Sequence, residues 1–227
     1  MLDDIVEYQE NLRQIRPRPK YKIFASSFFD ARKKLPDIKV DIVVTSPPYL
    51  NNYHYPRNTR PQIHWLGLGN GKGYESAGQS LSFGKFWQSV RDLPQGDLTF
   101  TLPELQHVID TVRERNNNNN HYGGVGWANY IVAYFNDTYR FCQTLKPILR
   151  RRGAAVVVLG NSIIQGVEVE TDQFFGKIAH LCGMDFEETV LLRKKRTGSS
   201  IIRSSVRVDK PTIKTALYES AIVLRKR

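Results

Sequence analysis

The chain has 227 residues, of which 41% are hydrophobic and 24% are charged, and it carries a formal net charge of +11. The length and the apolar content are those of one globular domain with one sizeable core, and no apolar run is long enough to span a bilayer. The excess of positive charge favours an anionic partner. Nucleic acid is the default partner, and a merely soluble basic surface is the alternative.

Two further features exclude other classes of protein. Cys142 and Cys182 lie in apolar helical patterns and are too few for a disulfide framework, so they are predicted to be buried thiols. The five histidines show no spacing typical of ligands, and no metal site is predicted. The N-terminal residues are polar and contain no segment of the signal-peptide type, so a cytoplasmic protein is expected.

The first fifty residues predict two helices and two strands. The pattern over residues 3–15 predicts a helix that Arg-Pro-Arg-Pro ends, residues 21–25 form a strand candidate, and residues 27–34 predict a short helix. Residues 40–45 form the most apolar strand of this half. Because this strand shows no alternation of apolar and polar residues, we expect both of its faces to be covered, as in a parallel sheet.

Residues 51–128 are rich in Gly, Asn, Gln and aromatic residues and show little periodicity. Helices are predicted over residues 81–93 and 102–115, followed by a loop that contains the run of asparagines. The block is too long for a simple connection, so it is interpreted as an inserted lid that contacts the target.

The second half alternates helices and strands. It predicts a long helix over 128–149, a buried strand over 154–160, and a helix over 171–181 with Thr171 as N-cap and Gly183 as its stop. Strands at 186–192 and 219–224 flank a basic loop, and with no helix between them they are predicted to pair antiparallel at one edge. The whole chain therefore predicts a single doubly wound α/β domain over residues 1–227.

The strand at 40–45 ends abruptly in Ser46-Pro47-Pro48-Tyr49. Prolines donate no backbone hydrogen bond, so the strand cannot continue through them. Thr-Ser-Pro-Pro-Tyr after a hydrophobic strand resembles motif IV of the amino-methylating DNA methyltransferases. In that family, Ser at this position is typical of cytosine-N4 enzymes, and Asp or Asn is typical of adenine-N6 enzymes.

Three further stretches carry the same resemblance. Residues 22–49 are similar to the family's run from motif III to motif IV, residues 145–162 resemble the later helix, glycine turn and strand, and residues 218–226 resemble the closing strand. The resemblance covers roughly residues 20–55 and 130–227. It implies a Rossmann-like sheet that uses S-adenosylmethionine and transfers its methyl group to the exocyclic amino group of a flipped base, within a restriction-modification type of system.

The resemblance also assigns roles at the strand end. An exocyclic amino group is a poor nucleophile, because its lone pair is delocalised into the ring, so acceptors aimed at its N–H groups must draw it toward tetrahedral geometry. The Ser46 side chain and the Pro47 carbonyl are the candidate acceptors, Pro48 stiffens the turn, and Tyr49 would stack on the flipped base. The alternative is that Pro-Pro merely ends a strand and Tyr49 fills the core.

Cofactor and nucleic-acid contacts are assigned in the same way. The resemblance places Asp30 beside the adenine of the cofactor and assigns Thr45 to the cofactor as well. Amide, aromatic and basic residues suited to gripping a flipped nucleotide follow the motif or lie in the basic loop: Asn51, Asn52, Tyr53, Arg57, Arg60, Arg196 and Arg203. A polar surface loop and a solvated charged loop are the alternatives. Asn161 and Ser162 are predicted to line the site.

The family's glycine-rich cofactor loop after a first strand has no match in the sequence, so the Rossmann-like sheet is expected to be incomplete and to lack roughly its first two strands. Residues 67–73 contain glycines but follow no buried strand. Three interpretations follow: a split methyltransferase whose second polypeptide carries the cofactor loop in a heterodimer, a non-catalytic nucleic-acid-binding fragment, or a complete enzyme with a divergent cofactor site. The split enzyme, with cytosine N4 as its target, is favoured, and adenine N6 or RNA as target remain alternatives.

Overall fold

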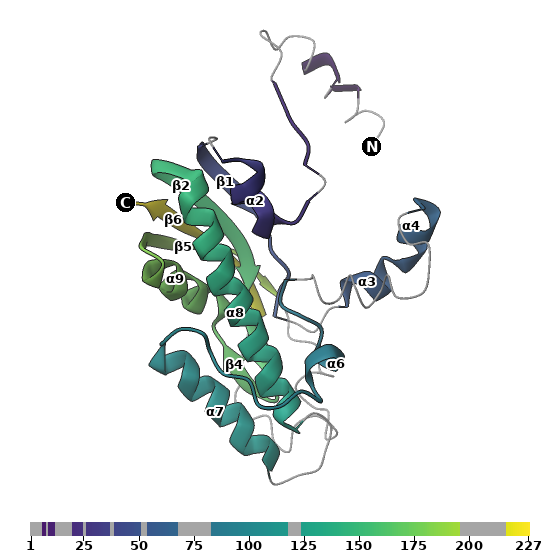
Figure 1. The fold of residues 1–227 in the computed structure, drawn as a ribbon, viewed down its shortest axis with the longest axis vertical. Coiled ribbons are helices and arrows are strands. Elements are labelled where there is room, and N and C mark those ends of the chain that lie inside the picture. The colour runs from purple at the N-terminus through teal and green to yellow at the C-terminus, as the bar shows by residue number, and fades with distance from the viewer. Residues whose placement is uncertain are drawn as a thin grey trace.

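The computed structural model describes residues 6–7, 9–11, 20–24, 26–36, 39–50, 54–67, 83–117, 124–195 and 217–227. Its centre is a sheet in the order β1-β2-β6-β5 (Figure 1). The strands are β1 (Val40–Thr45), β2 (Leu149–Gly160), β5 (Met184–Lys195) and β6 (Leu217–Lys226).

The strand directions form a mixed sheet. β1 pairs parallel with β2, whereas β6 pairs antiparallel with both β2 and β5. β1, β2 and β5 therefore run the same way, and β6 is the reversed strand between the last two. With β6 set aside, the parallel strands follow chain order, as in one half of a doubly wound sheet. The predicted α/β class and the antiparallel final pair are confirmed.

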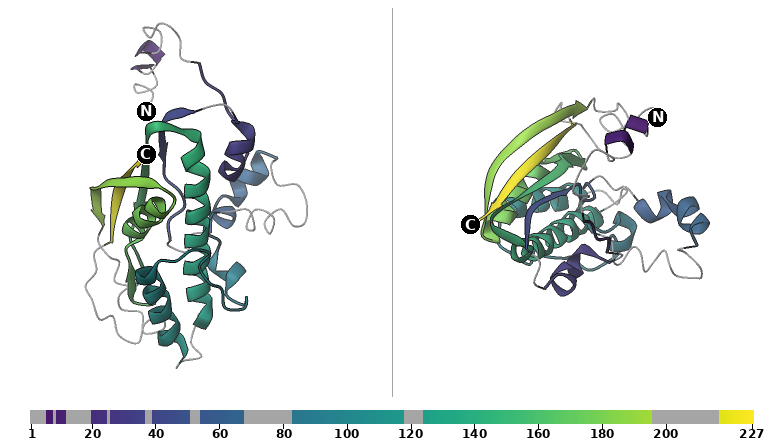
Figure 2. Two further views of the ribbon diagram at one scale, coloured as in Figure 1. Left: turned by 60° about the vertical axis from the view of Figure 1, so that its left-hand side comes forward. Right: turned by 90° about the horizontal axis from the view of Figure 1, so that it is seen from above.

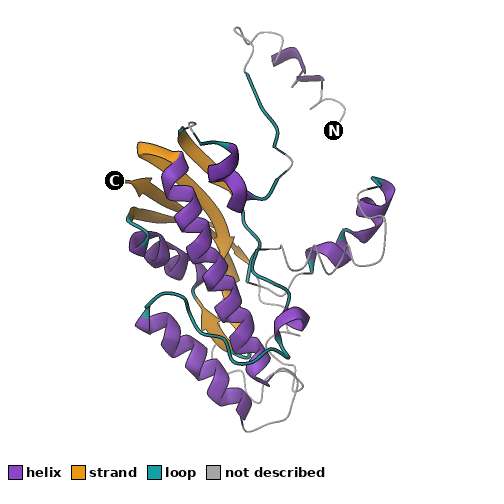
Figure 3. Cartoon of the chain, in the orientation of Figure 1, coloured by secondary structure: helices purple, strands orange, loops and turns teal. Residues whose placement is uncertain are grey.

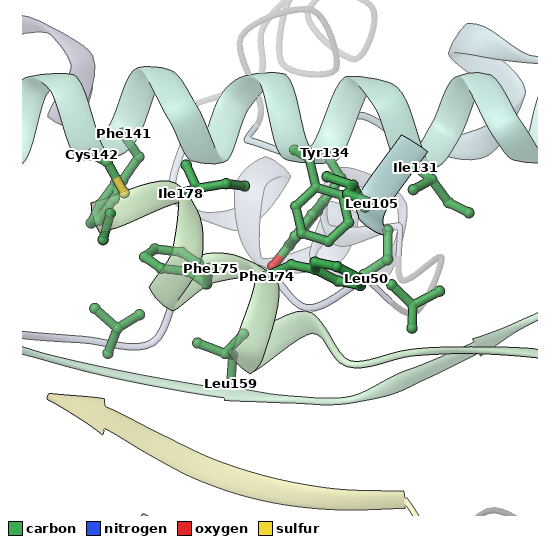
Figure 4. Packing of buried hydrophobic residues seen from close by; sticks show 14 of the residues in the cluster. Leu50, Leu105, Ile131, Tyr134, Phe141, Cys142, Leu159, Phe174, Phe175 and Ile178 are labelled. Atoms are coloured by element: carbon green, nitrogen blue, oxygen red, sulfur yellow. The ribbon is translucent and has the colours of Figure 1, made fainter. Parts of the chain in front are cut away.

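Helices cover one face of this sheet (Figure 2). They include α7 (Pro103–Asn117), α8 (Gly124–Ile148) and α9 (Thr171–Leu181), while the 3-10 turn η1 (Phe28–Asp30) and α2 (Ala31–Lys34) contact α8. Side chains of α8 and α9 fill the space between this layer and β2 (Figure 4). None of the helices in the described ranges is long and apolar enough to cross a membrane.

The two faces of the sheet differ in cover. Along β2, Ala155, Val157 and Leu159 are fully buried under the helices, while Val156 and Val158 point the other way and are half-buried. We call this second side the outer face. On β1 it carries Ile42, 58% exposed, and Val44, 70% exposed. The expectation that both faces of β1 are covered is therefore wrong for the described part of the chain, in which no helix lies over the outer face.

A second strand prediction is also wrong. Residues 20–24 form no strand, and Tyr21 and Ile23 are 86% and 84% exposed. An extended segment becomes a strand only when another strand pairs with it, and no described strand lies beside this one. Of the predicted helix over residues 3–15, the pieces at 6–7 and 9–11 are helical, and the rest lies outside the described residues.

The inserted block contains α3 (Tyr55–Asn58), α4 (Arg60–Trp65), α6 (Trp87–Val90) and α7. Of the helix predicted over 81–93, residues 81–82 lie outside the described residues, and in the remainder only the four residues of α6 are helical. Gly84 and Lys85 take positive φ values of 68° and 24°, so the helix begins after them. The helix predicted over 102–115 is confirmed as α7, which also includes Asn116 and Asn117. Residues 118–123 lie outside the described ranges.

The elements of the second half agree closely with the sequence. α9 has the predicted bounds, and Gly183 ends it at a φ of 77°. Its N-cap is Glu170 rather than Thr171, whose hydroxyl instead donates to the carbonyl of Val169 at 3.2 Å. The sequence did not predict the hairpin of β3 (Ser162–Ile164) and β4 (Val167–Val169) (Figure 3).

Candidate functional site

The Ser46–Tyr49 segment is anchored at both ends. β1 holds it on one side through the pairing of Thr45 with Val157, and Leu50 is fully buried on the other side. Between these anchors Ser46 is exposed, Pro47 is buried, and Pro48 and Tyr49 are half-buried. A serine hydroxyl is thus presented to solvent by a short segment that two prolines stiffen.

Tyr134 of α8 fixes the carbonyl of Pro48. Its hydroxyl donates to that carbonyl at 3.0 Å, although the two residues lie 86 positions apart. Burial, followed by the neighbouring tyrosines Tyr130, Tyr55 and Tyr49, raises the pKa of Tyr134, so it remains a neutral donor. No described residue donates to the carbonyl of Pro47.

Aromatic packing in turn fixes Tyr134. Phe83 meets its ring edge-on at 5.4 Å, and Phe135 does so at 5.3 Å. Gly84 lies so close that an added Cβ would be 2.6 Å from a ring carbon of Tyr134. The amide of Gly84 donates to Asp137 at 2.9 Å, which holds this loop against α8. Tyr134, which donates to the Ser46–Tyr49 segment at the tip of β1, is therefore held from several sides.

Tyr49 lies over the carboxyl end of β2. A Cβ added at Gly160 would be 3.7 Å from the Tyr49 ring. The next residue, Asn161, uses both atoms of its amide within the protein: the oxygen accepts from the Tyr218 amide at 2.9 Å, and the nitrogen donates to Glu168 at 2.9 Å. Ser162 is buried, and its hydroxyl has no partner among the described residues. The side chain of Asn161 thus serves the framework beside the tip.

A buried carboxylate completes this framework. Asp172, in the first turn of α9, accepts from the Tyr218 hydroxyl at 3.0 Å and from Ser220 at 2.9 Å. Desolvation and the charge of Asp172 raise the pKa of Tyr218. Sequence reasoning missed Tyr134, Asp172 and Tyr218, because each falls in an apolar helix or strand pattern and only the fold reveals its hydrogen-bond partner.

Asp30 and Thr45, the predicted cofactor residues, occupy different settings. Asp30 ends η1 with its side chain 47% exposed, 3.9 Å from Lys33. The turn is docked on α8 by stacking of Phe28 on Phe141 at 4.6 Å. Thr45 ends β1, whose other edge pairs with no described strand. No described contact joins Asp30 to the tip.

Of the predicted nucleic-acid contacts, the structure describes Arg57 and Arg60. Both are exposed, on α3 and α4, which extend away from the helix layer (Figure 1). His54 caps α3 by accepting from the Arg57 amide at 3.1 Å, and its ring lies 3.9 Å from that of Phe86. The predicted contacts Asn51, Asn52, Tyr53, Arg196 and Arg203 lie outside the described residues.

The described residues offer neither a metal site nor a glycine-rich phosphate loop. Within the described ranges, no three His, Cys, Asp or Glu side chains come together as a metal site would require. Of the glycine-rich stretch at 67–73, only Gly67 is described, and it follows helix α4 rather than a strand.

Comparison with known proteins gives few matches. No family model matches the chain, and no curated protein does. The solved structures that resemble it include a crystal structure of a protein from Thermus thermophilus described provisionally as a DNA modification methylase. That structure has a TM-score of 0.39 and 15% identity, and the match covers 87% of this chain and 51% of that one. The selenomethionine derivative of the same protein has a TM-score of 0.34 and 14% identity, with coverage of 87% and 50%. The chain spans about half the length of these structures. Similarity at this level does not assign a function to the chain.

Proposed function

We propose that this chain is the target-base half of an S-adenosylmethionine-dependent DNA methyltransferase that modifies the exocyclic N4 amino group of cytosine. The observation that carries the proposal is the end of β1: an exposed serine and a proline carbonyl that accepts from no described residue, held on a rigid segment beside an aromatic ring. Ligands of such sheets bind at the carboxyl ends of parallel strands, which is where this segment lies.

Each residue of the segment has a defined task. The Ser46 hydroxyl and the Pro47 carbonyl accept the two N–H groups of the target amine and turn its lone pair out of the ring plane. Tyr134 holds the adjoining carbonyl, so the two acceptors keep their spacing while the base enters. Tyr49 provides the stacking face for a flipped base. The amine gains a methyl group and releases one proton, and most of the acceleration comes from positioning.

S-adenosylmethionine would supply the electrophilic methyl group. The chain fits this cofactor in part: Asp30 offers a half-exposed carboxylate, and Thr45 lies at a free strand edge. No described strand leads into a glycine-rich loop. We therefore assign the rest of the cofactor site to a second polypeptide, which would pair with the free edge of β1 and cover the outer face, so that the two chains form a heterodimer.

Three alternatives keep different parts of this proposal. An adenine-N6 enzyme or an RNA methyltransferase would use the same tip, and serine favours cytosine only through the family resemblance. A non-catalytic nucleic-acid-binding fragment would explain the charge but not an exposed serine beside a fixed Pro-Pro turn.

Mass spectrometry of nucleosides tests the proposal. The chain is co-expressed with the polypeptide encoded beside it, and DNA and RNA from the host are digested and compared. We expect N4-methylcytosine in DNA. N6-methyladenine or a methylated RNA base would reject the target, and no methylated base with a verified complex would reject the enzyme.

Substitution of Ser46 separates catalysis from binding. Ser46→Ala removes one acceptor for the amine, so methylation should fall by about 100-fold or more while duplex binding stays within about twofold. Ser89→Ala, at an exposed serine of α6, is the matched control and should leave both unchanged. Equal loss of binding and methylation in Ser46→Ala would show that the serine supports the fold or the nucleic-acid contact instead.

A further inference from the structure

A dense group of cationic side chains lies at the amino ends of the parallel strands, which is the end of the sheet opposite to Ser46. They gather where β1, β2 and β5 begin and where β6 and α8 end, and we call this region the basic end: Lys39, Lys146, Arg150, Arg151, Arg152, Arg225, Lys226 and Arg227. Three carboxylates of the described chain, Asp41, Asp185 and Glu187, pair with members of the group. The positive charge of the basic end therefore exceeds what these partners neutralise.

Two lysines of the basic end make hydrogen bonds that hold the structure together. Lys39 donates to the carbonyl of Pro147 at 2.6 Å, and Lys226 donates to that of Leu149 at 2.8 Å. Both carbonyls lie at the carboxyl end of α8, where the helix dipole favours positive charge. Desolvation and the nearby charges of Lys39 and Lys146 lower the pKa of Lys226, which reflects the crowding of like charges here.

The arginines of β2 are arranged differently. Val40 pairs with Leu149 and Ile42 pairs with Ala154, so β2 has three more residues than β1 in this interval. The extra length is a bulge that holds Arg150, Arg151 and Arg152, all exposed. Arg150 binds Asp41 at 2.9 Å, but the side chains of Arg151 and Arg152 contact no carboxylate among the described residues. Two exposed arginines without a described carboxylate partner are thus adjacent in the chain.

The backbone at Arg152 adds a second, independent observation. Its φ is 61°, in the left-handed region where a residue with a Cβ is disfavoured and glycine is preferred. The turn uses only the backbone of Arg152, whose carbonyl accepts from Arg225 at 3.0 Å. Glycine would make the same turn without strain, and no described contact of the Arg152 side chain holds the turn. Strain kept at an exposed charge points to a ligand for that charge.

The geometry points to a second nucleic-acid contact at the basic end, in which Arg151 and Arg152 bind phosphates of the sugar-phosphate backbone. A single carboxylate satisfies one guanidinium, whereas a phosphodiester chain presents an anion at every nucleotide and can pair with adjacent arginines and with the charge behind them. Binding several phosphates also releases the counterions that the crowded cations otherwise hold. An acidic protein segment is the competing ligand.

This contact lies about 20 Å along β1 from Ser46, because the strand rises about 3.3 Å per residue. It is separate from the exposed arginines of α3 and α4 and is independent of base readout. The inference therefore goes beyond the proposed function and holds for this chain with or without methyl transfer.

Fluorescence anisotropy with the full chain and labelled duplexes of two unrelated sequences tests the contact. Binding is titrated between about 50 and 200 mM salt for the parent, Arg151→Ala and Arg152→Gly. Each variant should weaken binding equally for both duplexes and reduce the salt slope by about one. The double variant Arg151→Ala/Arg152→Gly is titrated as well. Between about 50 and 200 mM salt, its affinity should fall by a factor roughly tenfold smaller than that of the parent.

Thermal unfolding distinguishes a binding role of Arg152 from a structural one. A binding role predicts a higher unfolding midpoint for the glycine variant, and a structural role predicts a lower one. Arg152→Gly relieves the left-handed strain, so its unfolding midpoint should rise by about 2–4 °C while binding weakens. Lys177→Ala is the charge-matched control, because Lys177 is already paired with Glu104 at 3.0 Å, and it should leave the salt slope unchanged.

Three results would overturn the inference. Unchanged affinity and salt slope in the arginine variants would mean that the basic end faces a different partner, such as an acidic protein. A loss confined to one duplex sequence would indicate base readout. A lower unfolding midpoint for Arg152→Gly would mean that the side chain supports the fold. Absence of methylation with these binding results intact would reject the proposed enzyme and leave the contact standing.

Discussion

At the scale of single residues, the candidate site depends on one side chain that the sequence pattern hides. Tyr134 occupies a position of α8 that reads as core, and it is fully buried as that pattern predicts. Its hydroxyl nevertheless ends at the carbonyl of Pro48 and links the helix to the tip of β1. The buried hydroxyl of Tyr134 thus finds its hydrogen-bond partner in the Ser46–Tyr49 segment, which the proposed chemistry requires to be rigid.

Deletion of that hydroxyl should separate stability from catalysis. Tyr134→Phe keeps the aromatic packing and removes the bond to Pro48, so the free energy of unfolding should fall by about 0.5–1.5 kcal/mol. In the active complex, kcat should fall more than KM rises, because the loosened carbonyl changes the geometry of the acceptors. Urea denaturation and steady-state methylation measure the two effects.

Tyr139 offers the matched control. Its ring stacks on Phe100 at 4.9 Å, and no described residue bonds its hydroxyl. Tyr139→Phe should therefore change neither the unfolding free energy nor kcat beyond error. A Tyr134→Phe enzyme with unchanged kcat would remove the positioning role from the proposal.

At the scale of elements, α9 reaches the sheet through a glycine. A Cβ added at Gly176 would lie 2.6 Å from the ring of Phe186 on β5. Gly176→Ala should therefore push α9 from the sheet and destabilise the chain by about 1–3 kcal/mol, measured by urea denaturation. Gly96→Ala is the control, because its Cβ would meet Val132 at an ordinary 3.5 Å. A stable Gly176→Ala variant would show that β5 yields at this point.

A pH-dependent contact joins α7 to α9. A hydrogen bond from its own backbone amide, followed by one from Lys177, lowers the pKa of Glu104 from its ordinary value of 4.5. A depressed carboxylate contributes stability that is present above its unfolded pKa and is lost as pH falls through the lower folded value. The difference in unfolding free energy between the parent and Glu104→Gln should therefore shrink below about pH 4. Denaturation at several pH values measures it, with the exposed Glu114→Gln as the comparison.

The sequence pattern predicted the helices and strands that contain long periodic runs of apolar residues. It missed the features that depend on pairing between distant parts of the chain. The apolar spacing in α8 and the glycine that ends α9 are local signals, so the chain itself specifies them, whereas the N-cap of α9 was predicted one residue too late. The β3–β4 hairpin rests on positive φ values at Gln165 and Gly166, a turn for which Gln-Gly is a weak signal. The β2 bulge and the Tyr134–Pro48 bond join residues distant in sequence, which one sequence does not reveal. The strand predicted over residues 21–25 is absent from its described part for the same reason, since a strand needs a partner.

At the scale of the whole molecule, the sheet is covered on one side only within the described residues. All-parallel sheets occur almost exclusively with helices on both faces, and the β1–β2 end of this mixed sheet is parallel; an unpaired edge also invites pairing with another strand. The outer face of β1 exposes the apolar side chains of Ile42 and Val44, which is unusual for a sheet with all of its neighbouring elements in place. This imbalance supports the proposal that a second polypeptide completes the fold and supplies the cofactor loop.

Substitutions on the outer face should therefore damage assembly without damaging the isolated chain. Ile42→Thr/Val44→Thr keeps β-branched side chains at exposed positions, so the chain alone should lose no more than about 0.5 kcal/mol per site. The same variant should bind the partner at least tenfold more weakly, because each buried aliphatic side chain contributes about 1.5–3 kcal/mol. Co-purification and methylation of host DNA measure the loss. Val43→Thr, on the helix-covered side, should show the reverse: lower stability of the isolated chain and unchanged affinity for the partner per folded molecule. Full assembly and activity of the double variant would mean that the outer face is not where the cofactor half binds.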